Sequence, residues 1–227
     1  MKIVAVTGCM GLIGSHVTSE LLQRGYLVLG IDKLTYAANM EAVQTFKDLP
    51  GFTFLQKDIC DLETIPDCDY IINLAAESHV GNSIIDNTDF INTNISGVQN
   101  LLKIIQNKPS NVCERPILLH FSTDEVYGDL ESGSFTEDSS LNPSNPYSAT
   151  KAAADHLIKS WNRTYGTEYV IVRPTNNYGI FQYPEKLIPL SVKLLQRGKK
   201  IRLHNKGEPT RNWLHAADTA NAIVTIM

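Results

Sequence analysis

Residues 117–128, with the sequence ILLHFSTDEVYG, combine a short apolar run with two consecutive acids. An apolar run of this length, bounded by polar residues, is typical of a buried strand in a parallel sheet. Open α/β sheets bind their ligands at the carboxyl ends of such strands. We therefore expect an α/β fold, with Asp124 and Glu125 at the edge of the sheet where a ligand binds.

A tyrosine and a lysine follow about twenty residues later, within the sequence NPYSATK at residues 145–151. Asn145 can cap a helix and Pro146 suits its first turn, which places Tyr147 and Lys151 one turn apart on the same face. A phenol is a poor base at neutral pH, and a cation held beside it lowers its pKa. We predict that Tyr147 is a base and that Lys151 activates it, although this spacing alone also occurs by chance on exposed helices.

Three glycines occur in the sequence GCMGLIG at residues 8–14, between an expected strand and an expected helix. This context suits a dinucleotide, because the bare backbone allows a pyrophosphate to approach the N-terminus of the helix. Asp32 ends the next expected strand, where a carboxylate can accept hydrogen bonds from ribose hydroxyls and repel a 2′-phosphate. The sequence therefore favours NAD over NADP, and the neighbouring Lys33 weakens this preference slightly.

Strand-like segments alternate with amphipathic segments along most of the chain. Strands are expected at residues 2–7, 26–32, 52–56, 70–74, 117–122 and 169–173, and helices at residues 12–24, 40–47, 88–107, 146–165, 185–197 and 216–227. Right-handed crossovers place helices on both faces of one parallel sheet, so the expected fold is a Rossmann-type, doubly wound α/β sheet. Residues 1–174 would form the NAD-binding domain with the catalytic residues, and residues 175–227 would begin a smaller, incomplete substrate-binding part.

The composition narrows the class of protein. The 227 residues are 43% hydrophobic and 19% charged, which is ordinary for a globular chain, and the net charge of −4 argues against nucleic-acid binding driven by electrostatics. The apolar start is too short for a signal peptide and no later run could span a bilayer, so we expect a cytoplasmic protein without a membrane segment. The scattered Cys9, Cys60, Cys68 and Cys113 predict reduced thiols and no metal site.

Several short motifs together make the chain resemble a known superfamily. The three glycines, Asp58-Ile59, Asn73-Leu74-Ala75-Ala76, Tyr147-x-x-x-Lys151 and Arg173-Pro174 look like an extended short-chain dehydrogenase/reductase. Within it, the chain is similar to the nucleoside-diphosphoglucose 4,6-dehydratases, above all those acting on dTDP-glucose, through the sequences DKLTYA (32–37), AESHV (76–80), STDEVYG (122–128), NNYG (176–179) and PEKLIP (184–189).

The resemblance implies a closed hydride cycle on NAD. Tyr147 would take the proton of the glucose 4-hydroxyl, with Thr123 positioning it, while hydride passes from C4 to NAD⁺. Glu125 would then remove the C5 proton and Asp124 would protonate the departing C6 hydroxyl. Hydride returns to C6 and leaves a 4-keto-6-deoxy sugar. The implied catalytic residues are Thr123, Asp124, Glu125, Tyr147 and Lys151.

The resemblance also implies binding residues and a homodimer. NAD would be contacted by Gly8, Gly11, Leu12, Ile13, Gly14, Asp32, Lys33, Asp58, Ile59, Leu74, Ala75, Ala76, Thr93, Ser122, Tyr147 and Lys151. The sugar nucleotide would be held by Ser78, His79, Thr123, Asn176, Glu185, Lys186 and Arg211, with the Arg211 guanidinium on the diphosphate. Helices near residues 88–107 and 146–165 would pair across the dimer, where Ala152, Ala153 and Ala154 allow close approach or serve internal packing.

Other functions remain open at this point. A sugar-nucleotide 4-epimerase would share the Tyr147 and Lys151 pair but has no need of the acid pair, and a UDP-glucose or CDP-glucose 4,6-dehydratase would share most catalytic residues. A non-catalytic NAD-sensing protein tends to lack the tyrosine and lysine. The chain departs from the family's pattern at Cys9 and Asn212, and family members continue well past residue 227, so we expect a truncated chain.

Overall fold

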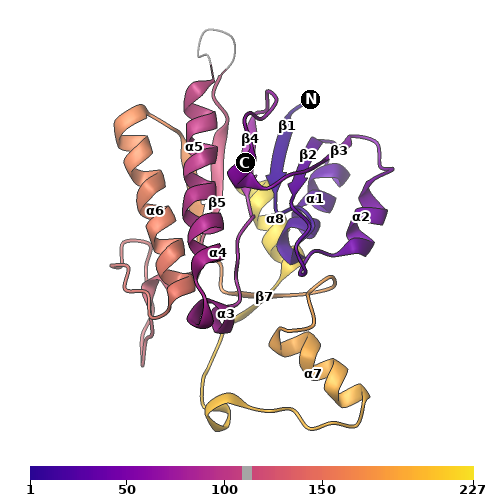
Figure 1. Ribbon diagram of the computed structural model, residues 1–227, viewed down its shortest axis with the longest axis vertical. Helices are drawn as coiled ribbons and strands as arrows, with labels where there is room; N and C mark the ends of the chain where they lie inside the picture. Colours follow the sequence, from indigo (N-terminus) through magenta and orange to yellow (C-terminus); the bar gives the residue numbers. More distant parts are fainter. Residues whose placement is uncertain (109–113) are drawn as a thin grey trace.

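The computed structural model describes residues 1–108 and 114–227, and its centre is a six-stranded sheet in which all strands run parallel. The strand order is β3-β2-β1-β4-β5-β6 (Figure 1). The strands are β1 (Ile3–Thr7), β2 (Leu27–Asp32), β3 (Phe52–Gln56), β4 (Tyr70–Asn73), β5 (Ile117–Phe121) and β6 (Tyr169–Val172). The predicted fold class is confirmed, and the order reverses between β1 and β4, which is where such sheets bind their ligands.

Helices cover both faces of the sheet, as the alternation predicted (Figure 1). One face carries α1 (Leu12–Gln23), α2 (Met40–Phe46) and α8 (Ala216–Ile226), and the other carries α4 (Thr88–Ile91), α5 (Val98–Asn107) and α6 (Pro146–Tyr165). Side chains of one strand alternate between the two cores, as Val4 and Val6 pack with α1 while Ala5 packs with α5 and α6. The strands β1, β4 and β5 are buried on both faces and therefore read as continuous apolar runs.

The helix expected at residues 88–107 is interrupted. Between α4 and α5 the chain forms a turn of π-helix, η2 (Asn92–Gly97), a feature that often marks functional positions. Inside this turn the buried Asn94 side chain accepts a hydrogen bond from the Glu77 backbone N–H and donates to the Glu77 carbonyl and the Thr150 hydroxyl, at 3.0, 3.0 and 2.9 Å. The turn therefore ties the segment after β4 to helix α6.

The remaining short elements lie at the carboxyl edge of the sheet and beyond it. They are the 3₁₀ turns η1 (Ile59–Asp61), η3 (Asp124–Tyr127) and η4 (His204–Gly207), the helices α3 (Val80–Ile85) and α7 (Leu187–Gln196), and a second parallel pair formed by β7 (Asn176–Tyr178) and β8 (Trp213–His215). None of α3, β7 and β8 was predicted, because each is too short to show a period.

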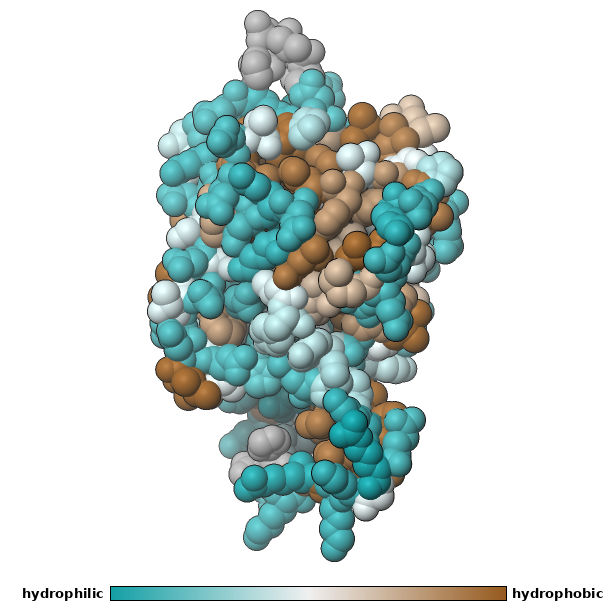
Figure 2. Space-filling model, turned by 45° about the vertical axis from the view of Figure 1, so that its right-hand side comes forward, coloured by the Kyte–Doolittle hydropathy of each residue, from teal (hydrophilic) through white to brown (hydrophobic). Residues whose placement is uncertain are grey.

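Residues after 174 divide between two environments. Helix α7 has no buried residue, and its apolar side chains lie beside lysines and arginines on the projecting lower part of the molecule (Figure 2). Helix α8 instead packs on α1, with Ala220, Ile223 and Val224 in the core of that face. Helix α8 therefore completes the core on the face of the sheet that carries α1 and α2.

Two further expectations concern membrane segments and thiols. Among residues 1–108 and 114–227, no helix is both long and apolar enough to cross a bilayer. Cys9, Cys60 and Cys68 carry free thiols, and Cys113 lies outside the described residues.

Candidate active site

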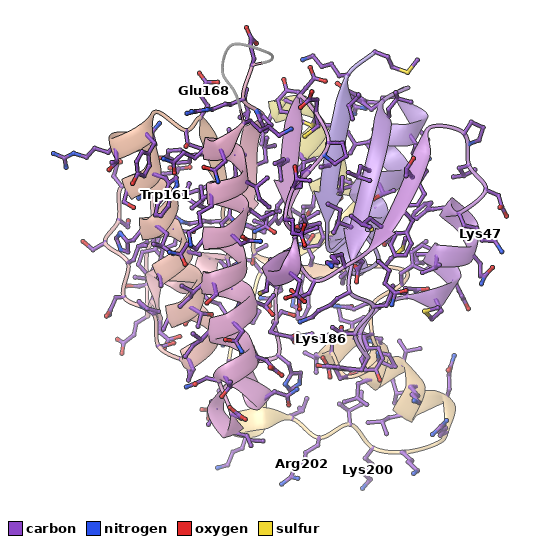
Figure 3. The ribbon with its side chains drawn as sticks, turned by 45° about the horizontal axis from the view of Figure 1, so that its top comes forward. Lys47, Trp161, Glu168, Lys186, Lys200 and Arg202 are labelled. Atoms are coloured by element: carbon purple, nitrogen blue, oxygen red, sulfur yellow. The ribbon has the colours of Figure 1, made fainter. Side chains whose placement is uncertain are left out.

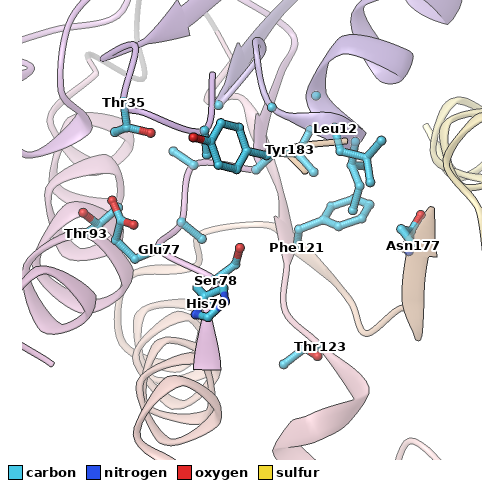
Figure 4. Close-up of a pocket in the computed structure, with 18 of the residues that line it drawn as sticks. Leu12, Thr35, Glu77, Ser78, His79, Thr93, Phe121, Thr123, Asn177 and Tyr183 are labelled. Carbon is cyan, nitrogen blue, oxygen red and sulfur yellow. The ribbon is translucent and has the colours of Figure 1, made fainter. Parts of the chain in front are cut away.

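A cleft of about 540 Å³ runs along the carboxyl ends of β1, β4 and β5. The glycine turn lines it on one side, the segment after β4 forms another wall, and residues 174–177 and 182–187 close it from the smaller part (Figure 4). The cleft therefore lies at the point where the strand order reverses, as expected for this class of fold.

The glycine turn has the shape that a dinucleotide pyrophosphate needs. Gly8 has a φ of +66°, and a Cβ built on it would lie 2.6 Å from the backbone nitrogen of Ala75. A Cβ on Gly14 would collide with the Gly8 carbonyl, whereas one on Gly11 would meet only that carbonyl oxygen, at 3.4 Å. Gly8 and Gly14 thus allow close packing, while Gly11 leaves space in front of α1. The first turn of α1 has no side-chain cap and lines the cleft, so its free N–H groups are available to an anion.

Asp32 ends β2, Lys33 follows it, and both line the cleft. The Asp32 carboxylate accepts hydrogen bonds from the backbone N–H groups of Met10 and Leu34, at 2.9 and 2.8 Å. Burial raises the pKa of Asp32, and the two hydrogen bonds oppose that rise. The acid therefore also ties the glycine turn to the end of β2.

The Lys33 ammonium is surrounded by oxygen atoms from other elements. It lies 3.3 Å from Asp58 Oδ2, 3.5 Å from Glu77 Oε1 and 3.2 Å from the Thr93 hydroxyl, and Figure 4 shows Glu77 and Thr93 side by side. Burial lowers the pKa of Lys33, but the charges of Asp58 and Glu77 outweigh it and raise the pKa overall. Two carboxylates thus offset this cation, which leaves the region unfavourable to a 2′-phosphate.

Tyr147 and Lys151 share one face of α6, and both are nearly buried. The Lys151 ammonium donates to the carbonyl oxygen of Phe121 and lies 3.5 Å from Nε2 of the buried His120. Burial lowers the pKa of Lys151 to about 8, and the charge of Asp155 opposes the change. Lys151 therefore contacts the end of β5.

The pKa of Tyr147 is raised, which is opposite to the predicted direction. Burial is the main cause, the charge of Glu125 adds to it, and a hydrogen bond with the Thr123 side chain works against it. The sequence argument assumed that Lys151 decides this pKa. In the structure the lysine is directed to the Phe121 carbonyl, and the charge that affects the pKa of Tyr147 most is that of Glu125.

The acid pair lies in the turn η3, directly after β5. The Thr123 hydroxyl accepts from the Glu125 backbone N–H at 3.3 Å and donates to Asp124 Oδ1 at 3.4 Å. Glu125 lines the cleft, and its Oε2 accepts a hydrogen bond from Nδ2 of Asn145 at 3.1 Å. Glu125 and Tyr147 both line the cleft, and the charge of Glu125 raises the pKa of the Tyr147 phenol, whereas Asp124 is not part of the lining.

The cleft brings together nearly all the residues that the sequence predicted. Two lie outside its lining: Asp124, and Arg211, whose exposed guanidinium donates to its own neighbour's carbonyl at Thr210. The residues that line it are Thr123, Glu125, Tyr147, Lys151, Gly8, Gly11, Leu12, Ile13, Gly14, Asp32, Lys33, Asp58, Ile59, Leu74, Ala75, Ala76, Thr93, Ser122, Ser78, His79, Asn176, Glu185 and Lys186.

His79 and Lys186 combine local structural contacts with a place in the cleft. His79 Nδ1 accepts from the Asn82 N–H at 3.2 Å and so caps α3. Lys186 Nζ donates to the Ser78 carbonyl at 3.2 Å and stands at the start of α7, facing the main body (Figure 3). Lys200 and Arg202 lie at the far end of that part and extend away from the cleft.

Sequence reasoning missed several residues of the cleft. Glu77 was quoted only within a motif, and Tyr36 and Tyr183, whose ring centroids are 5.3 Å apart, join the two sides of the cleft. His120 lies behind the lining of the cleft and was interpreted only as part of a strand, yet it is buried beside Lys151, with its Nδ1 3.0 Å from Asn73 Nδ2. A histidine within an otherwise aliphatic buried strand was the signal that could have found it.

Comparisons with known proteins agree with this geometry. Residues 4–227 match the family model described as "NAD dependent epimerase/dehydratase family". The chain is 42% identical to a probable dTDP-glucose 4,6-dehydratase of Sinorhizobium fredii over 99% of this chain and 67% of that protein, and 40% identical to the dTDP-glucose 4,6-dehydratase of Haemophilus influenzae over 100% and 71%.

Solved structures give the same picture. A dTDP-glucose 4,6-dehydratase from Streptomyces venezuelae, crystallised with NAD bound, superposes with a TM-score of 0.92 at 39% identity, over 99% of this chain and 71% of that one. A UDP-glucuronic acid 4-epimerase from Bacillus cereus reaches the same TM-score of 0.92 at 27% identity, over 99% and 72%. On its sequence and on its fold, this chain belongs to the NAD dependent epimerase/dehydratase family.

Proposed function

We propose that the protein is an NAD-dependent dTDP-glucose 4,6-dehydratase. The observation that carries this proposal is that Glu125 and Tyr147 line the same cleft as the glycine turn, close enough for the charge of Glu125 to raise the pKa of Tyr147. An alcohol oxidation needs only the tyrosine, and a carboxylate beside it adds a second base for a carbon acid. The relatives at about 40% identity carry this name, whereas the epimerase structure is 27% identical.

The residues present fit NAD. The glycine turn and the uncapped N-terminus of α1 would hold the pyrophosphate, and Asp32 would accept from the adenosine ribose. The buried hydroxyl of Ser122 has no hydrogen-bond partner among the described residues, and it lies in the lining of the cleft, where the nicotinamide would bind. NAD supplies the acceptor and donor for hydride.

The first step belongs to Tyr147. Its phenolate would take the proton of the sugar 4-hydroxyl, with the Thr123 hydroxyl orienting both groups. The raised pKa of Tyr147 means that the negative phenolate needs cations nearby, and Lys151 and Lys186 are the two that line the same cleft. Lys186 also faces Glu125, whose charge favours its protonated form although burial lowers the pKa of Lys186 overall.

The elimination belongs to the acid pair. A ketone at C4 acidifies the C5 proton, which Glu125 would remove, and Asp124 would give a proton to the C6 hydroxyl as it leaves as water. Asp124 lies behind Thr123 in this arrangement, so the acid role requires its side chain to turn toward the cleft. Adjacent carboxyl groups in different environments suit opposite protonation states, as this step requires.

The test is to incubate the full protein with dTDP-glucose and with UDP-glucose separately. Loss of one water from the dTDP sugar, measured by mass spectrometry, is the expected result. A 4-epimerase would instead yield an isomer of unchanged mass, a UDP-glucose dehydratase would prefer the other substrate, and an NAD-sensing protein would convert neither. Tyr147→Phe should abolish reduction of the bound cofactor. Glu125→Gln should permit reduction and block water loss.

Substrate contacts and assembly are further parts of the proposal. We propose that residues 1–174 hold the cofactor and that residues 175–227 begin the sugar-nucleotide part, with Ser78, His79, Asn176, Glu185 and Lys186 on the substrate. Arg211 would reach the diphosphate only if its exposed loop moves toward the cleft. We also propose a homodimer through α5 and α6. Ala152 and Ala154 are buried inside the chain and so serve internal packing. Light scattering measures the mass of the assembly.

A further inference from the structure

Asn145 uses both ends of its side-chain amide. Its Oδ1 accepts from the Ser148 backbone N–H at 2.9 Å, while its own backbone N–H donates to the Ser148 hydroxyl at 3.3 Å, which forms a capping box at the start of α6. Its Nδ2 points the other way and donates to Glu125 Oε2 at 3.1 Å. One side chain thus joins the helix that carries Tyr147 to the turn that carries Glu125.

The second contact is not a requirement of helix capping. Asp, Ser and Asn cap helices about equally well, because each offers a side-chain oxygen to the first free N–H groups. Only asparagine also offers an N–H₂ group on the opposite side. An aspartate would cap α6 as well, but it would place a second negative charge against Glu125.

We propose that Asn145 is a positioning residue for Glu125, which it orients toward the cleft and stabilises in the ionised form. This inference rests on the proposed function, in which Glu125 removes the C5 proton. A hydrogen bond donated to a carboxylate favours its charged form, and the charged form is the one that can act as a base. Asn145 touches no substrate atom and acts through Glu125.

The other groups that face Glu125 do not supply this contact. Asp124 lies on the same turn and is an acid. Tyr147 faces Glu125 from α6, and the charge of Glu125 raises the pKa of that phenol. Lys186 faces it from the segment before α7, where it donates to the Ser78 carbonyl. Among the described residues, the Asn145 amide is the side-chain donor within hydrogen-bond distance of the carboxylate.

The decisive variant is Asn145→Asp, and Asn39→Asp is its matched control. Asn39 caps α2 in the same way, with its Oδ1 accepting from Glu41 and Ala42 at 2.7 and 3.0 Å. Both variants exchange one capping asparagine for one capping aspartate. Only the first brings a new charge to Glu125, so both variants should stay folded, with Asn39→Asp close to wild type in thermal unfolding and Asn145→Asp lower because of the repulsion between the two acids.

Stopped-flow mixing of the full protein with dTDP-glucose separates the two halves of the reaction. Absorbance of the reduced cofactor follows oxidation at C4, and product formation follows elimination. In Asn145→Asp the acid limb of product formation should move up by about one pH unit, which is tenfold in ionised base, while the rate of reduction is unchanged. Reduced cofactor should therefore accumulate at low pH, and Asn39→Asp should show neither effect.

A second readout needs no turnover. The side-chain carboxyl carbon of Glu125, assigned in a ¹³C-glutamate-labelled protein by its absence in Glu125→Gln, should titrate at higher pH in Asn145→Asp than in wild type. Asn145→Ser keeps a capping oxygen and lacks the amide donor, so elimination should slow relative to reduction. This variant decides the matter if Asn145→Asp does not fold.

The outcomes separate the two proposals. An acid limb and a Glu125 titration that are the same in Asn145→Asp and wild type would overturn the positioning role, even if Glu125→Gln accumulates reduced cofactor as expected. If Glu125→Gln forms product at the normal rate, the dehydratase assignment itself fails.

Discussion

Arg173 is expected to hold together helix α6 and the turn η3, the two elements that carry the proposed catalytic residues. Its Nε donates to Asp155 Oδ2 at 2.9 Å, its Nη1 donates to the Tyr127 hydroxyl at 2.7 Å, and its guanidinium lies 5.1 Å from the centre of the Tyr127 ring. Asp155 belongs to α6 and Tyr127 to η3. The Asp155 side chain is 0% exposed, so its carboxylate has no access to water.

Replacing Arg173 by methionine should therefore be costly. It leaves a buried carboxylate without its cation, a change that typically costs about 3–5 kcal/mol of the free energy of unfolding. Losing the hydrogen bond to Tyr127 adds about 1 kcal/mol. Because whole domains are stable by roughly 5–15 kcal/mol, this is a large share, and urea unfolding should show a clearly lower midpoint.

The double variant Arg173→Met with Asp155→Leu provides the control. The double variant also removes the buried Asp155 carboxylate, which the single variant leaves without its cation. Most of the lost stability should therefore return. A single variant that loses less than about 1 kcal/mol, or a double variant no better than the single, would refute the argument that the buried pair joins these elements.

Two further predictions concern the cleft. Because burial lowers the pKa of Lys151 from 10.5 to about 8, the unfolded chain binds more protons than the folded one between these values, and stability should rise with pH across that window. Lys151→Met should remove the rise in pH-dependent urea unfolding and, below pH 8, add about 3 kcal/mol of stability at the expense of activity. Gly11→Ala should keep the fold and weaken NAD binding by roughly tenfold or more in calorimetry, about 1.4 kcal/mol, because its Cβ fills the space in front of α1. Gly8→Ala should instead fail to fold normally, since its Cβ would lie 2.6 Å from the Ala75 backbone nitrogen, and equal behaviour of the two variants would contradict this distinction.

The sequence predicted the sheet because its central strands β1, β4 and β5 are buried on both faces and its long helices are amphipathic. Periodicity could not reveal the π turn at Asn92–Gly97, because a single wider turn of six residues is too short to show a period of its own. It also missed β7 and β8, which are three residues each. These short strands bring the chain back toward the cleft, and they carry Asn176 into its lining.

The candidate site was predictable where the backbone determines it. The positions of the turn glycines and of the residues at strand ends are determined by the backbone of the sheet. Gly8, Gly14 and Asp32 therefore lie where the sequence predicted them. Side-chain direction is a different matter. Asp124 and Glu125 are neighbours, yet only Glu125 lines the cleft, because consecutive residues of a tight turn point in different directions.

The relative position of the two proposed bases depends on contacts outside the motifs that name them. Both Arg173 and Asn145 join helix α6 to the turn η3 through hydrogen bonds. The segment of chain that connects η3 to α6 runs over the surface. The Asn142 backbone N–H donates to the Val126 carbonyl at 2.9 Å, which closes that segment at its base. A change in the length of segment 129–140 should therefore leave the relative position of Tyr147 and Glu125 unchanged. A substitution of Arg173 or Asn145 should instead change the position of one base relative to the other.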